Sequence, residues 1–190
     1  DSALRGWPES PRHLAHYQVV MARVGLHLYA GESRTAGQLL DRETRGFRTL
    51  RVTRVPLLAT RLHVQRGRAA IMDDDLRRAR VEARRLDRLD LPIARGYAAA
   101  VRAALELAGG ATYRAQELLA TAEDCFRAQG IKHMEAACQY RLGHLLGGSA
   151  GDRMTARASA WMHAHGVANP SRMLDFLTPG FAGGAVPRAK

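Results

Sequence analysis

Apolar residues recur every three or four positions along most of the chain, and polar residues fill the positions between them. This is the period of a helix with one buried face, and no stretch alternates apolar and polar residues over the length of a strand. The clearest stripe consists of Leu76, Ala79, Ala83, Leu86 and Leu89. The pattern therefore predicts an all-α protein.

Proline and glycine divide this pattern into separate helices. Proline suits the first turn of a helix, and glycine is common just after the last turn. Pro56 and Pro92 mark two such starts, and Gly31 marks an end. The predicted helices cover about residues 10–30, 35–53, 56–72, 73–89, 92–109, 112–128, 131–146 and 152–165, with a short ninth helix after Asn169 and Pro170.

Composition supports a folded helical protein and excludes other classes. The 190 residues are 46% hydrophobic and 25% charged, which excludes a disordered or collagen-like chain. Alanine and arginine, two strong helix formers, are abundant. No run of apolar residues is long enough to span a bilayer. The chain starts at Asp1 without a signal-peptide pattern, so we expect a fragment or processed product that acts in the cytoplasm.

The predicted helices follow a repeat of roughly 40 residues. Gly31, Met72, Gly109 and Gly147 end every second helix. A regular spacing of this size is typical of stacked helical hairpins, because each hairpin buries its apolar face against its neighbours. We predict a right-handed array of four hairpins over residues 1–181, with the odd-numbered helices lining a concave face, and a flexible tail over residues 182–190. A plain helical bundle is the alternative.

One predicted hairpin resembles a tetratricopeptide (TPR) unit, in which small residues sit where two helices cross closely. Alignment on the turn at Gly110 places three alanines and one leucine at the family's packing positions: Ala103, Ala115, Ala122 and Leu119. The family's tyrosine and terminal proline are replaced by Glu106 and Arg127. The resemblance implies a degenerate TPR-like α-α superhelix.

The C-terminal stretch resembles the TPR-like region at the end of many large bacterial serine/threonine protein kinases. The residues that carry this resemblance are Cys125, Phe126, Gly130, Ala136, Ala137, Arg141–Gly143, Leu145–Gly148, Trp161, Met162, Gly166, Asn169, Pro170, Arg172, Met173, Leu177 and Pro179–Phe181. The resemblance implies a sensory or scaffolding part of a signalling kinase whose catalytic domain lies outside this chain.

Sequence signatures of catalysis and cofactor binding are absent. The kinase glycine-rich loop, the His-Arg-Asp and Asp-Phe-Gly motifs and the GxxxxGK[ST] loop do not occur. Gly147–Gly151 is interpreted as an interhelical loop. The pairs His13/His16 and His163/His165 lack the carboxylates that would complete a metal site. We therefore expect a non-enzymatic chain with no cofactor and no metal.

The two cysteines carry no metal-site or redox motif. Cys125 and Cys138 lie 13 residues apart, and neither has a CxxC partner. We predict two small buried residues in a reducing compartment, with a regulatory disulfide as the alternative.

The net charge of +11 is concentrated in one segment. Residues 34–68 carry nine arginines against two acids, whereas residues 69–90 carry six of each. In that balanced fourth helix we expect pairs such as Asp73–Arg77 and Arg78–Glu82, which argue against a nucleic-acid surface there. The candidate partner-binding residues, which suit phosphate or carboxylate, are Arg45, Arg48, Arg51, Arg54 and Arg61. A solvated outer face is the alternative interpretation.

These observations favour a protein-interaction and regulatory module. Its partner would be a protein or a peptide, and an acidic partner is one option. The alternative is a helical-repeat domain that binds nucleic-acid phosphates through residues 34–68. An effector-sensing arm of a transcription regulator is a third hypothesis. A TPR clamp of the chaperone type is disfavoured, because the chain holds only Asn169, Lys132 and Lys190 of the residue types that such clamps use.

Overall fold

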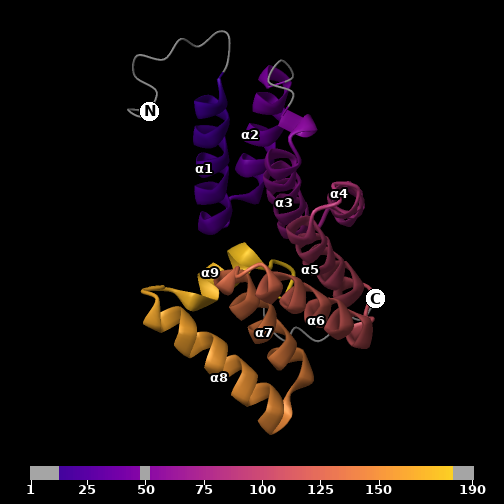
Figure 1. Ribbon diagram of the computed structural model, residues 1–190, viewed down its shortest axis with the longest axis vertical. Helices are drawn as coiled ribbons and strands as arrows, with labels where there is room; N and C mark the ends of the chain where they lie inside the picture. The colour runs from indigo at the N-terminus through magenta and orange to yellow at the C-terminus, as the bar shows by residue number, and fades with distance from the viewer. Residues whose placement is uncertain (1–12, 48–51, 182–190) are drawn as a thin grey trace.

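The computed structural model describes residues 13–47 and 52–181, and in these ranges the chain is all-helical (Figure 1). Ser10 and Pro11, the predicted start of the first helix, lie outside the described residues, as does the predicted tail. The elements are α1 (Leu14–Ala30), α2 (Ser33–Gly46), the short 3₁₀ helix η2 (Val52–Arg54), α3 (Pro56–Met72), α4 (Leu76–Asp87), α5 (Pro92–Ala108), α6 (Thr112–Ala128), α7 (Lys132–Leu146), α8 (Gly148–Ala164) and α9 (Pro170–Leu177).

Each helix packs mainly on its neighbours in sequence, so that α1–α8 form four consecutive hairpins. Figure 1 shows the array running from α1–α3 at one end to α6–α8 at the other, with α9 folded back between α1 and α7. The predicted all-α fold of about four stacked hairpins is confirmed. Among the described residues, no helix is both long enough and apolar enough to cross a membrane.

Local sequence chemistry sets several helix starts. Pro56 and Pro92 occupy the first turns of α3 and α5, where proline costs no helical hydrogen bond. The side chain of Asp75 accepts a hydrogen bond from the backbone N–H of Arg78 at 3.0 Å and caps α4. The side chain of Asn169 caps α9 in the same way, through the backbone N–H of Arg172 at 2.9 Å.

Two predicted boundaries are wrong. The second helix ends at Gly46 rather than near residue 53, and Phe47, its C-cap residue, is buried with its ring packed edge-on against Tyr17 at 5.6 Å. The predicted loop at Gly147–Gly151 is mostly helix. Gly147, with φ of 64°, makes the whole connection, and α8 begins at Gly148.

Large side chains form the core of the first hairpin and α3. Tyr17, Met21, Leu28, Leu40 and Phe47 are buried together in one cluster. The Tyr17 hydroxyl donates a hydrogen bond to the carbonyl oxygen of Leu58 at 2.7 Å, and burial raises the pKa of Tyr17 to about 12. The hydroxyl is thus satisfied while the ring fills the core.

Small side chains dominate the core from α5 to α8. Ala103, Ala115, Leu119 and Ala122, the four residues placed at TPR packing positions, are all 0% exposed. Between α7 and α8 the approach is closer still: a Cβ atom added to Gly143 would lie 2.7 Å from the carbonyl oxygen of Gly151. Alanine and glycine therefore let these helices approach more closely than larger residues would.

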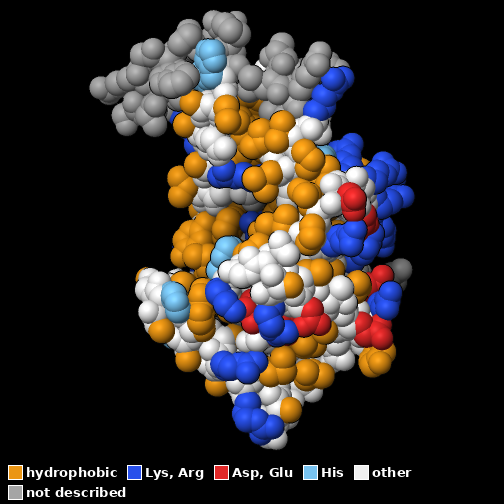
Figure 2. All heavy atoms as spheres, viewed as in Figure 1, with side chains coloured by type: hydrophobic (Ala, Val, Ile, Leu, Met, Phe, Trp, Pro, Cys, Tyr) orange, Lys and Arg blue, Asp and Glu red, His pale blue; other side chains and the backbone are white. Residues whose placement is uncertain are grey.

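The ion pairs of α4 differ from those predicted. Arg78 binds Asp41 of α2 at 2.5 Å. Glu82 is buried, where it contacts His63 at 2.7 Å and Arg85 at 2.8 Å. The predicted pairing of Arg78 with Glu82 is therefore wrong, because partners from other helices take both groups. Figure 2 shows the basic side chains that gather over α4.

Candidate functional site

The inner face of the array is covered by α9 and the residues that follow it. Tyr29 of α1, Arg68 of α3 and Arg141 of α7 all contact this segment, and Gly180 approaches Ala104 of α5. The odd-numbered helices therefore share one face, as predicted, and that face meets a segment of the same chain. We call residues 169–181 the C-terminal strap.

Arg68 of α3 contacts the strap at the end of α9. Its Nε donates to the carbonyl oxygen of Leu177, the last residue of α9, at 3.2 Å. Its guanidinium also lies 4.7 Å from the centre of the Phe176 ring and 5.8 Å from that of Tyr97. A cation at the C-terminal end of a helix interacts favourably with the helix dipole, so Arg68 stabilises the end of α9.

Arg68 is buried without a carboxylate partner among the described residues. Burial lowers the pKa of its guanidinium, because little water remains to solvate the charge. Only neutral groups surround the charge: the carbonyl oxygen of Leu177, the side-chain oxygen of Gln65, the sulfur of Met134 and the rings of Tyr97 and Phe176. A buried cation with only neutral partners is costly, so the strap is integral to the fold around Arg68.

Arg141 holds the other side of the strap. Its guanidinium donates to Thr178 at 3.2 Å, to the carbonyl oxygen of Phe181 at 3.3 Å and to the Asp175 carboxylate at 2.8 Å. The Arg141 side chain is 6% exposed, whereas that of Asp175 is half exposed. These contacts fix the carboxylate of Asp175, which is therefore not available as a free anion.

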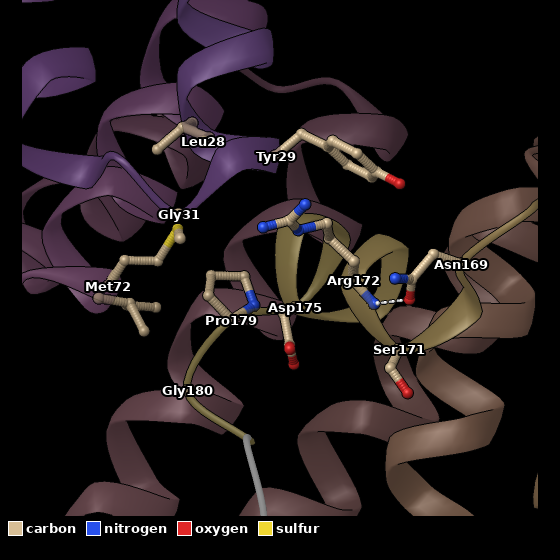
Figure 3. Close-up of a pocket in the computed structure, with 11 residues that line it drawn as sticks. Leu28, Tyr29, Gly31, Met72, Asn169, Ser171, Arg172, Asp175, Pro179 and Gly180 are labelled. Carbon is tan, nitrogen blue, oxygen red and sulfur yellow. Dashed lines mark hydrogen bonds between the residues drawn. The ribbon is translucent and has the colours of Figure 1, made fainter.

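A cleft of about 610 Å³ remains between the strap and the ends of α1 and α3 (Figure 3). Its apolar wall consists of Leu28, Ile71, Met72 and Pro179. The polar groups on the opposite side come from α9 and its cap, namely Asn169, Ser171, Arg172 and Asp175. A cleft with one apolar wall and a few polar groups suits a short peptide or a small molecule.

Arg172 is the unneutralised charge of this cleft. Its guanidinium lies over the ring of Tyr29, 5.7 Å from the ring centre, and Figure 3 shows it between α1 and α9. It has no carboxylate partner among the described residues, since the nearby Asp175 is bound by Arg141. An exposed guanidinium on an aromatic face is well placed to form a charge-assisted hydrogen bond with an incoming carboxylate.

The structure does not bring the predicted partner-binding arginines to this cleft. Arg45 is exposed on the last turn of α2, Arg54 is exposed at the end of η2, and Arg61 donates to the side chain of Gln18. Arg48 and Arg51 lie outside the described residues. A role for the segment 34–68 in partner binding stays a prediction.

Four side chains at the strap were not predicted as site residues: Tyr29, Arg68, Arg141 and Arg172. For two of them a signal was available. Arg68 follows Val64 by four positions and precedes Ile71 by three, so it occupies a core position of α3. Arg141 follows the buried Ala137 by four positions in the same way. An arginine on the buried stripe of a helix predicts a buried polar contact.

The histidine pairs do not form a metal site in the described structure. The backbone N–H of His13 donates to Nδ1 of His16 at 3.0 Å, and Nδ1 of His165 pairs with the carbonyl oxygen of Trp161 at 2.8 Å. Within residues 13–47 and 52–181 no three His, Cys, Asp or Glu side chains gather closely enough to hold a metal ion.

Comparisons of the chain with protein-family models, with curated proteins and with solved structures gave no significant match.

Proposed function

We propose that the chain is a non-catalytic protein-interaction module that binds a short acidic peptide segment in the cleft between α1 and the C-terminal strap. The observation that carries this proposal is the position of Arg172, a guanidinium without a carboxylate partner that lies on Tyr29 at the edge of a 610 Å³ cleft. The apolar wall takes one or two apolar side chains of the peptide, and Arg172 binds its carboxylate.

The arrangement of the helices supports a binding role. In a stack of hairpins the inner helices present side chains from several repeats to one ligand. Here α1, α3 and Pro179 of the strap supply the apolar wall, and α9 supplies the cation. The module is of the kind expected in the cytoplasmic C-terminal part of a bacterial serine/threonine signalling kinase, where peptide binding would control the site or the timing of kinase action.

The test begins with selection of binders from an immobilised library of random 12-residue peptides by the full chain. We expect the selected peptides to combine aspartate, glutamate or a free C-terminal carboxylate with an apolar residue. Arg172→Glu should weaken their binding at least about 10-fold, because a charge-assisted hydrogen bond contributes about 1.5–3 kcal/mol. Isothermal titration calorimetry measures the difference.

The matched control is Arg157→Glu, which reverses an exposed arginine on α8 away from the cleft. This variant should bind the selected peptides like the unmodified chain. Selection of peptides without carboxylates, or equal losses in the two variants, would refute the proposed site.

A further inference from the structure

Three arginines of α4 and its C-cap residue, Arg88, form a row on the outer face of the helix. Arg77, Arg80, Arg84 and Arg88 are separated by three, four and four residues, and all four are exposed. At 3.6 residues per turn these positions fall within about 80° of the helix circumference and extend over about 16 Å. We call these residues the α4 arginine row.

The acids of α4 do not neutralise this row. Glu82 points into the core, where it contacts His63 and Arg85, and Asp87 pairs with Arg102 of α5. Asp75 caps the helix. Within the described residues none of the four arginines has a carboxylate partner. The row therefore presents four positive charges to solvent along the helix, and the exposed carboxylates of the segment, Asp73, Asp74, Asp75 and Asp90, lie in the turns at the two ends of α4.

The opposite face of α4 argues against a membrane as the partner. Ala79, Ala83 and Leu86 are 0–1% exposed, because they pack into the array. A helix that binds a bilayer surface must place its own apolar face among the acyl chains. The apolar face of α4 is already occupied by α3 and α5.

The surroundings of the row also differ from a protein interface. Such interfaces have an apolar centre with aromatic anchors. On α4 itself, Val81 is the one large apolar side chain that is clearly exposed, and α4 has no aromatic residue. The lack of aromatic residues on this helix also disfavours single strands, which bind by stacking their bases on aromatic rings.

We propose that the α4 arginine row binds the backbone phosphates of duplex nucleic acid without reading the bases. Guanidinium groups match phosphate oxygens with two parallel hydrogen bonds, and a row of them suits a polymer with regularly spaced charges. This activity is separate from peptide binding in the cleft, since the two surfaces share no residue.

The test measures binding of the full chain to a fluorescein-labelled 20-base-pair DNA duplex of mixed sequence by fluorescence anisotropy. Four phosphate contacts predict that the affinity falls about 150-fold between 50 and 200 mM NaCl. The double variant Arg80→Gln/Arg84→Gln should bind more weakly at 50 mM, and its affinity should fall only about 12-fold over the same range. A duplex of another sequence should give the same values.

The control variant Arg153→Gln/Arg157→Gln removes two exposed arginines from α8 and should keep the affinity and salt dependence of the unmodified chain. The circular dichroism spectra of both double variants should match that of the unmodified chain. The salt dependence of the unmodified chain tests the proposal even if a variant misfolds.

The proposal would be overturned by no duplex binding at 50 mM NaCl, by an equal loss in both double variants, or by tighter binding of polyglutamate than of the duplex. The last result would assign the row to an acidic protein. Binding to phosphatidylserine vesicles that matches duplex binding and depends on the same arginines would assign it to a membrane surface and would also overturn the proposal.

Discussion

In α1–α3 the helices are held apart by large side chains such as Tyr17, Met21 and Leu40, whereas from α5 to α8 alanine and glycine let them lie close together. Both regions exclude water from their cores, but by different means. The first depends on filled volume, because removal of a large side chain leaves a cavity. The second depends on close approach, because an added methyl group has no space.

The largest expected effect is a truncation in the first region. Leu40→Ala should lower the free energy of unfolding by about 3 kcal/mol, because Leu40 is fully buried and its loss leaves a cavity. Urea unfolding followed by circular dichroism measures the change. The control Leu26→Ala, at a residue of α1 that is 70% exposed, should change it by less than about 0.5 kcal/mol. Similar values for the two variants would contradict a volume-dependent core.

An enlargement in the second region should have the next largest effect. Gly151→Ala should lower the free energy of unfolding by about 2 kcal/mol, because the new methyl group would overlap the carbonyl oxygen of Gly143. The same change at Gly37 of α2, where no atom lies within 4 Å of the new Cβ, should raise it by up to about 1 kcal/mol. If both variants gain stability, the α7–α8 contact is looser than the structure shows.

The smallest expected effect on the protein is a difference between its two cysteines in their rate of reaction with a thiol reagent. Cys138 is fully buried on α7, and burial raises the pKa of its thiol, while Cys125 is partly exposed. Ellman's reagent at pH 8 should therefore modify Cys125 first and leave Cys138 unreacted, because the thiolate is the reactive form. Gly151→Ala should speed the reaction of Cys138 if it loosens the packing around α7. Equal rates for the two cysteines in the unmodified chain would show that this packing opens readily.

Most of the fold follows from local sequence chemistry. Pro56 and Pro92 open helices at the predicted residues, and Ala103, Ala115 and Ala122 lie at a close helix crossing because their small size suits it. The predicted helix boundary is wrong where the chain makes a tertiary contact. At the end of the second helix Phe47 contacts Tyr17 of α1, a partner that no local pattern reveals.

The candidate site was less accessible to sequence analysis. Arg68 and the carbonyl of Leu177 are 109 residues apart, and only the folded chain brings them together. The charges of α4 show the same limit. The local spacing predicts an Arg78–Glu82 pair, but Asp41 from another hairpin binds Arg78 instead. Charge counts along the chain therefore concealed a row of exposed arginines that have no carboxylate partner among the described residues, because Glu82 is buried and Asp87 pairs with Arg102.

The return of α9 has a consequence for how the chain unfolds. In an open stack each hairpin touches only the next one, so the ends can melt while the middle survives. Here the end of the described chain is bonded to α3 and α7 and packs on α1, which joins distant hairpins into a closed circuit. Because these contacts tie the first and last hairpins together, we expect the array to unfold in a single cooperative step.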